Sequence, residues 1–212
     1  MKIKKKILIL GSTGSIGASA LNVIKRYRSA IDIVCLSTNR NYKKLLKQSK
    51  IFNVKNLIIN DYNNFIKAKK FSTYKKVKLY PNVSEFLKEN NKKIDLAIIG
   101  ISGLDGLKPT LDVIPATKVV ASANKESIIC GWKFIKNKLK KCKTNFIPID
   151  SEHFSIWSLL NNDKHLISKI YLTASGGPLL NTSQDKLEKI NINNVIKHPN
   201  WSMGKKISTD SA

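Results

Sequence analysis

Short apolar runs rich in β-branched residues alternate with amphipathic stretches at helical spacing over the first 149 residues. Buried parallel strands form continuous apolar runs, and each needs a crossover connection that is usually a helix. The alternation therefore predicts an α/β fold with a Rossmann-like, doubly wound, mostly parallel sheet. The expected strands are 7–10, 31–37, 56–59, 77–80, 96–100, 118–121 and 145–149. The expected helices are 15–26, 42–48, 62–69, 84–90, 107–114 and 126–141.

The regular alternation ends near Asp150, which predicts a domain boundary at 149. Beyond it we expect a helix over 154–160, a strand over 168–173 and a Gly-Gly-Pro turn, as the first part of an α+β catalytic domain at 150–212. Asp210 and Ser211 have the residue types of a helix N-cap. We therefore expect the chain to stop within that domain.

Composition places the chain among ordinary globular proteins, with 42% hydrophobic and 25% charged residues in 212. No apolar run approaches the roughly 20 residues of a membrane-spanning helix, and 7–10 is shorter than a secretory apolar core. We expect a cytoplasmic protein without a membrane partner. The cysteines, Cys35, Cys130 and Cys142, have no metal or redox spacing, so we expect reduced thiols.

A net charge of +24 raises nucleic-acid binding as a hypothesis. The basic residues are almost all lysines scattered through every segment, and only Arg26, Arg28 and Arg40 are arginines. Phosphate clamps and groove readers favour the planar guanidinium. We therefore expect a solvated lysine-rich surface and no specific nucleic-acid partner. The alternative, a basic nucleic-acid-binding protein, predicts affinity that depends steeply on salt.

Three glycines, Gly11, Gly14 and Gly17, follow the first expected strand and open the first expected helix. Glycines there permit a tight turn and the close approach of a dinucleotide pyrophosphate to the helix N-terminus. The spacing, G-x-x-G-x-x-G, meets the usual fingerprint only approximately. A plain strand-to-helix turn is the alternative.

The second expected strand ends without an acid, in Ser37-Thr38-Asn39-Arg40-Asn41. An NAD enzyme places an acid at this point on the ribose hydroxyl. Asp32 lies at the opposite end of the strand. The pattern predicts NADPH over NADH, with Arg40 against the 2′-phosphate; the alternative is a surface arginine in a loop.

Asp150 and Glu152 follow the last expected strand, and in extended geometry residues two apart project to the same face. Two carboxylates converging at the carboxyl end of a sheet suit Mg²⁺ or Mn²⁺. A solvated turn is the alternative. Residues 123–127 bring a lysine and an amide near the same crevice, although Asn124 also suits a helix N-cap.

Two further motifs lie in 150–212. Residues 175–178, Ser-Gly-Gly-Pro, supply a hydroxyl and open backbone N–H groups suited to a phosphate. Residues 198–206 place a histidine, a tryptophan and a methionine between a proline and a glycine, which suits a flap that closes over a polar ligand. An ordinary loop with one anchoring tryptophan is the alternative.

Together, residues 11–17, 123–127, 150–153, 175–178 and 198–212 resemble, in order and spacing, the 1-deoxy-D-xylulose 5-phosphate reductoisomerase family. The resemblance implies an NADPH-dependent enzyme that uses Mg²⁺, Mn²⁺ or Co²⁺. It implies conversion of 1-deoxy-D-xylulose 5-phosphate to 2-C-methyl-D-erythritol 4-phosphate in non-mevalonate isoprenoid synthesis, and a homodimer. Another NADP-linked Rossmann oxidoreductase, such as a semialdehyde or homoserine dehydrogenase, is the alternative.

The resemblance also implies roles for individual residues. The cofactor would contact Thr13, Gly14, Ser15, Ile16, Asn39, Arg40, Asn41, Asn124, Glu126 and Gly204. The phosphorylated sugar substrate would contact Lys125, Ser151, Glu152, Ser175, His198 and Ser211. The metal would bind Asp150 and Glu152, and Trp201 and Met203 would belong to the flap.

The family continues beyond the position of Ala212 into a helix with an Asn, a Lys and a third metal-ligating Glu, and then into a C-terminal helical domain. The 212 residues contain neither. We therefore expect them to form an inactive fragment that binds NADPH better than it catalyses, with negligible turnover in isolation.

Overall fold

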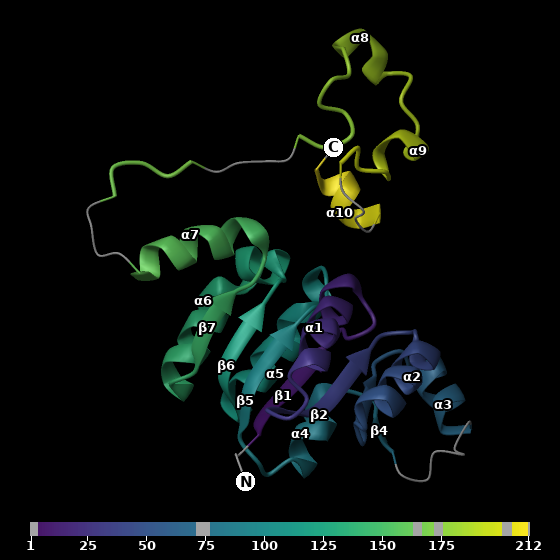
Figure 1. Ribbon diagram of the computed structural model, residues 1–212, viewed down its shortest axis with the longest axis vertical. Coiled ribbons are helices and arrows are strands. Elements are labelled where there is room, and N and C mark those ends of the chain that lie inside the picture. The colour runs from purple at the N-terminus through teal and green to yellow at the C-terminus, as the bar shows by residue number, and fades with distance from the viewer. Residues whose placement is uncertain (1–3, 71–76, 163–166, 172–175, 201–204, 212) are drawn as a thin grey trace. The chain divides into compact units, whose positions relative to one another are not determined.

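The computed structural model describes residues 4–70, 77–162, 167–171, 176–200 and 205–211 (Figure 1). It divides into two compact units, Met1–Asn162 and Asp163–Ala212, called unit 1 and unit 2. Each unit is described by itself.

Unit 1 contains a seven-stranded sheet whose neighbouring strands all pair in parallel, in the order β4-β3-β2-β1-β5-β6-β7. The strands are β1 (Lys5–Leu10), β2 (Ile31–Thr38), β3 (Asn56–Ile59), β4 (Lys78–Tyr80), β5 (Ile94–Ile99), β6 (Thr117–Ser122) and β7 (Asn145–Pro148). The helices are α1 (Ser15–Arg26), α2 (Tyr42–Phe52), α3 (Tyr62–Lys70), α4 (Val83–Glu89), α5 (Leu107–Val113), α6 (Lys125–Cys142) and α7 (Ser151–Asn162). The doubly wound parallel fold is confirmed.

Helices cover both faces of this sheet, which explains why its central strand β1 is apolar over its buried part, Ile7 to Leu10. In β1, Leu8 and Leu10 lie in the core that α4, α5 and α6 share. Ile7 and Ile9 point to the other face and lie in the core that α1, α2 and α3 share. Successive side chains of a strand alternate between faces, so a strand buried on both sides needs apolar residues at every position.

The strand order reverses at the pair β1 and β5, in the middle of the sheet (Figure 1). In open α/β sheets, ligands bind beyond the carboxyl ends of the strands at this point. The segments that follow β1 and β5 lie side by side there, because Gly100 N donates to Leu10 O at 2.8 Å. The topology thus predicts that residues 11–17 and 100–103 form part of a ligand site.

Helix α7 starts three residues before the expected helix 154–160 and packs against β7, so unit 1 extends past residue 149. The predicted start of the catalytic domain at 150 stays a prediction. In unit 2 the described helices are short: α8 (Gln184–Leu187), α9 (Ile192–Val195) and α10 (Lys205–Asp210). The turn after Gly176 and Gly177 is present at 177–181, and both glycines have positive φ.

Two expectations for unit 2 are wrong. The described part of the expected strand 168–173, residues 168–171, is not a strand. A strand needs a neighbour to complete its hydrogen bonds, and the described residues of unit 2 include no other strand. Asp210 ends α10 and does not begin a helix. Thr209 Oγ1 donates to Lys205 O at 2.9 Å, and Ser211 Oγ donates to Ser208 O at 3.0 Å. Both hydroxyls therefore bond back to carbonyls of α10, the helix that precedes this end of the chain.

The cysteines are free thiols, as expected. Cys35 is buried in β2, and burial raises the pKa of its thiol well above the usual value. Cys130 and Cys142 lie on α6. Within the described residues, no helix combines the length and the apolar character needed to cross a membrane.

Acid should weaken the sheet at Asp95 of β5, which accepts from Lys118 Nζ at 2.7 Å and from Lys6 N at 2.8 Å. These bonds, led by that of Lys118, lower the pKa of the Asp95 carboxyl. The stabilisation is present above the unfolded pKa of about 4 and is lost as pH falls through the lower folded value. We expect Asp95→Asn to flatten the acid dependence of the free energy of unfolding, measured by urea titration. An unchanged slope would contradict this.

Candidate nucleotide and metal site

The loop after β1 can exist in this form only with glycine at two positions. Gly11 has φ +79°, and a Cβ there would lie 2.7 Å from Gly100 O. A Cβ on Gly17 would overlap Gly11 O and Ser12 Cα. These glycines let the first turn of α1 sit directly against the loop and let the loop sit against the segment after β5.

The N-terminus of α1 is open to an anion. Gly14 is its N-cap and supplies no side-chain hydrogen bond, and the first turn contains no acidic residue. Gly14 and Ser15 are exposed, whereas Thr13 and Ile16 are half-buried. The first N–H groups of a helix have no partner within the helix, and together with the helix dipole they bind phosphate. The residues predicted to hold the cofactor phosphates therefore form a suitable cradle.

Helix α2 and strand β2 hold this loop in place. Ser12 is buried, its Oγ donates to Gln48 Oε1 at 2.8 Å, and Gln48 Nε2 donates back to Ser12 O at 2.8 Å. Gly11 N donates to Ser37 Oγ at 2.9 Å. Because the loop is fixed by groups from elsewhere in the fold, the cradle exists before any ligand arrives.

The predicted adenosine end of the site, Asn39, Arg40 and Asn41, is exposed at the carboxyl end of β2. The Asn41 side chain caps α2 by accepting from Lys44 N at 3.1 Å. Arg40 Nε lies 3.8 Å from Asp61 Oδ2, and the Arg40 side chain is 78% exposed. Asp61 follows β3 and was missed by sequence reasoning, which searched for an acid only at the end of β2.

Asn124 is almost fully buried at the start of α6, and its side chain serves the fold. Its Nδ2 donates to Ile101 O at 2.6 Å and to Gly103 O at 2.8 Å, and its Oδ1 accepts from Ser127 N at 2.8 Å. The interpretation of Asn124 as an N-cap is confirmed. Its contact with a cofactor stays a prediction, and both amide protons are already used.

Lys125 and Glu126, which follow this N-cap, are half-buried in the first turn of α6. The segment 100–103, Gly-Ile-Ser-Gly, was missed as part of the site. A signal was present, because one glycine ends the expected strand 96–100 and a second follows three residues later.

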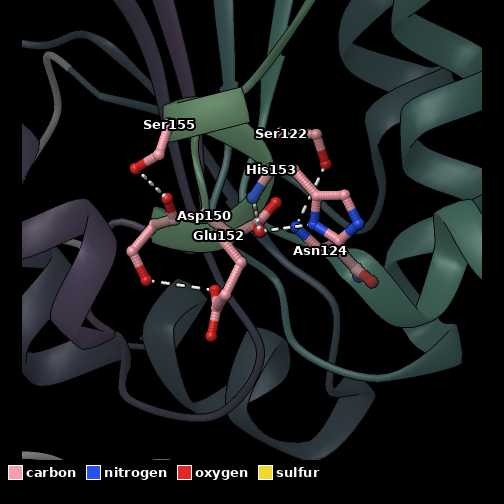
Figure 2. A network of polar contacts seen from close by, with 7 residues as sticks. Ser122, Asn124, Asp150, Glu152, His153 and Ser155 are labelled. Atoms are coloured by element: carbon pink, nitrogen blue, oxygen red, sulfur yellow. Dashed lines mark hydrogen bonds and ion pairs between the residues drawn. The ribbon is translucent and has the colours of Figure 1, made fainter. Parts of the chain in front are cut away.

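Asp150 lies between β7 and α7, beside the end of β6, since Ile149 N donates to Ser122 O at 2.8 Å. Its Oδ1 accepts from His153 N at 3.0 Å and lies 2.6 Å from His153 Nδ1 (Figure 2). Its Oδ2 is buried and has no hydrogen-bond partner among the described residues. A buried carboxylate oxygen without a partner is costly, and a bound cation removes that cost.

The extended geometry expected for Asp150 and Glu152 is wrong. Ser151 begins α7, and in a helix residues two apart point in nearly opposite directions. Figure 2 shows the Asp150 carboxylate turned toward His153 and the Glu152 carboxylate turned away from it, where it accepts from Ser151 Oγ at 3.0 Å. The capped first turn of α7 therefore separates two side chains that the sequence pattern places together.

The donor set still fits a divalent cation. Across the described residues, no cluster of three or more His, Cys, Asp or Glu side chains is placed to hold a metal. Asp150 Oδ2 is a hard oxygen ligand, and Glu152 supplies a second, exposed carboxylate in the first turn of α7. Two carboxylates are a partial coordination shell of the kind that Mg²⁺ completes with waters and substrate.

Unit 2 contains the other predicted site residues. His198 is buried, and its Nδ1 accepts from Asn200 N at 3.2 Å. Ser211 is half-buried, and its Oγ donates to Ser208 O. The remaining four, Ser175, Trp201, Met203 and Gly204, lie outside the described residues.

Comparison with known families identifies the chain. The family model described as 1-deoxy-D-xylulose 5-phosphate reductoisomerase matches residues 7–131, and the model of its C-terminal domain matches residues 146–212. The chain belongs to the 1-deoxy-D-xylulose 5-phosphate reductoisomerase family. Membership sets aside the alternative of a semialdehyde or homoserine dehydrogenase.

Reductoisomerases of several bacteria match nearly the whole chain. The protein of Pelagibacter ubique (strain HTCC1062) is 57% identical over 211 residues, which is 98% of this chain and 54% of the relative. That of Wolbachia pipientis from Culex pipiens (strain wPip) is 41% identical over 209 residues, also 98% and 54%. The chain thus spans about half the length of the reductoisomerases that it matches.

Solved reductoisomerases have the same fold. The enzyme of Zymomonas mobilis in complex with NADPH superposes with a TM-score of 0.82 at 32% identity, covering 99% of this chain and 54% of that chain. A second reductoisomerase, in complex with NADPH, fosmidomycin and magnesium, gives a TM-score of 0.85 at 30% identity and covers 98% and 54%.

Proposed function

We propose that the whole protein converts 1-deoxy-D-xylulose 5-phosphate to 2-C-methyl-D-erythritol 4-phosphate in non-mevalonate isoprenoid synthesis, with NADPH and a divalent cation. One observation carries the proposal. In a member of this family, a preformed anion cradle and a buried carboxylate oxygen, unpartnered among the described residues, lie along the carboxyl edge of one sheet. Because the chain spans about half the length of its relatives, the proposal concerns the whole protein.

The cofactor end of the proposal rests on unit 1. Thr13, Gly14, Ser15 and Ile16 would hold the NADPH pyrophosphate at the open N-terminus of α1. Asn39, Arg40 and Asn41 would hold the adenosine end, and Asn124 and Glu126 would also contact the cofactor. The family resemblance adds Gly204, which lies outside unit 1 and outside the described residues. Bound there, NADPH would supply the hydride of the reduction. Related structures contain NADPH.

The metal end rests on Asp150, whose unpartnered oxygen supports binding of Mg²⁺, Mn²⁺ or Co²⁺, with Glu152 as second ligand. Bound there, the cation would polarise the substrate's carbonyl and hydroxyl oxygens. Lys125, Ser151, Ser175, His198 and Ser211 would orient the phosphorylated sugar, several of them at its phosphate. Trp201 and Met203 would exclude water as part of a flap.

Two further parts belong to the proposal. The homodimer rests on the family resemblance, and the place in the cytoplasm rests on the short apolar runs of the sequence. Size-exclusion chromatography with light scattering tests the first part, and a mass of one protomer contradicts it. Fractionation of source cells tests the second, and recovery with the membrane fraction contradicts it.

Cofactor preference is tested by calorimetric titration of the purified chain. We expect NADPH to bind at least about tenfold more tightly than NADH, because a phosphate–guanidinium contact contributes about 1.5–3 kcal/mol. Arg40→Met should remove most of that difference and leave NADH binding nearly unchanged. Tighter binding of NADH by the wild-type chain would contradict the cofactor assignment.

Turnover is tested by following NADPH absorbance after addition of 1-deoxy-D-xylulose 5-phosphate and Mn²⁺. The whole protein should oxidise NADPH and form 2-C-methyl-D-erythritol 4-phosphate, whereas the 212-residue chain alone should show negligible turnover. If the whole protein fails to react, the proposed activity is wrong. If the 212 residues turn over at a comparable rate, the expectation of an inactive fragment is wrong.

A further inference from the structure

Helix α2 contacts the glycine loop at two points that lie one helical turn apart. The first is the buried, reciprocal pair of hydrogen bonds between Gln48 and Ser12. The second is at the surface, where Lys44 Nζ donates to Thr13 O at 2.7 Å. Because the Gln48 pair already fixes the loop, a lysine whose long side chain costs entropy to order is not required as a second brace.

Lys44 also lies next to the loop predicted to hold the adenosine end of the cofactor. It is in the first turn of α2, and its backbone N–H donates to Asn41 Oδ1. The two loops meet at their threonines, Thr13 Oγ1 and Thr38 Oγ1, which lie 2.7 Å apart. In Rossmann folds the adenosine ribose passes between the glycine loop and the end of the second strand. The Lys44 ammonium contacts one loop and its backbone the other, which places it at that passage.

The charges around Arg40 leave room for a second cation. A 2′-phosphate carries nearly two negative charges at neutral pH. Arg40 stands opposite Asp61, whose carboxylate is 3.8 Å away and offsets part of the guanidinium charge. Hydrogen bonds from Asn64 lower the pKa of the Asp61 carboxyl, so it stays ionised. Arg40 alone therefore leaves the phosphate incompletely neutralised.

We propose that Lys44 is a second cation of the 2′-phosphate subsite and, with Arg40, sets the preference for NADPH over NADH. An ammonium has three N–H donors, and Thr13 O takes one, which leaves two for phosphate oxygens. The same lysine thus connects the 2′-phosphate to the loop that holds the pyrophosphate. This inference rests on the proposed use of NADPH.

A purely structural role for Lys44 makes a different prediction. If Lys44 only braces the Thr13 carbonyl, its loss disturbs the pyrophosphate cradle, which NADPH and NADH share. Both cofactors would then lose affinity by the same factor. A contact with the 2′-phosphate affects only molecules that carry this group.

The experiment compares Lys44→Met with Lys44→Arg and with the control Lys43→Met, which removes an equal charge from the neighbouring exposed position. Calorimetry with the purified chain measures binding of NADPH, NADH and adenosine 2′,5′-bisphosphate. We expect Lys44→Met to weaken NADPH and the bisphosphate about tenfold, the size of one charged hydrogen bond. NADH should change by less than about twofold, and Lys43→Met should shift each ligand by less than about twofold, as expected for a screened surface charge.

Lys44→Arg should keep NADPH binding within about threefold of wild type, since guanidinium also binds phosphate. Equal losses for NADPH and NADH, or no loss for NADPH, would overturn the role of Lys44 while leaving the proposed function intact. A wild-type chain that binds neither cofactor, or prefers NADH, would overturn both. Circular dichroism checks that Lys44→Met folds; if it does not, Lys44→Gln, which keeps an N–H donor for Thr13 O, replaces it with the same expected results.

Discussion

Replacing Gly17 by alanine should abolish NADPH binding and lower the free energy of unfolding by about 3 kcal/mol or more, the upper range for overpacking. The added Cβ would overlap backbone atoms of Gly11 and Ser12. Neither can move away, because Ser12 is held by Gln48 and Gly11 already abuts Gly100. Urea unfolding and calorimetric titration with NADPH measure the two effects.

Gly14→Ala is the matched control for stability in the same loop. A Cβ on Gly14 would meet Gly11 O at 3.4 Å, an ordinary contact, and its φ of −77° suits any residue. The exchange should cost less than about 1 kcal/mol, as expected for an N-cap that makes no side-chain bond. A Gly17→Ala variant as stable as Gly14→Ala would show that the loop yields, against the packing seen here.

The second large effect is expected for Asn124→Ala, which should cost about 3 kcal/mol in the free energy of unfolding. The substitution leaves the Ile101 and Gly103 carbonyls and the Ser127 N–H without their partner, and buried polar groups that lose a hydrogen bond cost about 1–3 kcal/mol each. Release of the segment 101–103 should also disturb the adjacent glycine loop and weaken NADPH binding. Urea unfolding followed by circular dichroism measures the loss.

Asn82→Ala is the control, because Asn82 is also an N-cap but stands at the exposed start of α4 and accepts one bond, from Glu85 N at 2.9 Å. Its loss should cost about 1 kcal/mol, the usual value for an N-cap. If the two variants lose equal stability, the buried network around Asn124 contributes little. Asn124 would then be free to serve the cofactor as the family resemblance implies.

Local patterns predict the elements of unit 1 well because the periodicity of a strand or helix is a property of consecutive residues. The helix 15–26 was predicted with its observed bounds, and α2 extends to Phe52 where 42–48 was expected. The pairing of one strand with another, in contrast, depends on residues that are distant in sequence. Residues 168–171 have the composition of a strand, yet form none, and the described residues of unit 2 include no strand with which they could pair.

For the site, the sequence by itself determined the residue types and their order: a glycine loop after β1, an arginine after β2, and two carboxylates after β7. The tertiary structure alone decided what each side chain is available to do. Asn124 is engaged by carbonyls more than 20 residues earlier in the chain, and Asp61 reaches Arg40 from the end of the next strand. Asp150 keeps a buried oxygen that has no partner in the part of the chain that the structure describes. Hydrogen bonds and burial depend on groups distant in sequence, so spacing alone cannot supply them.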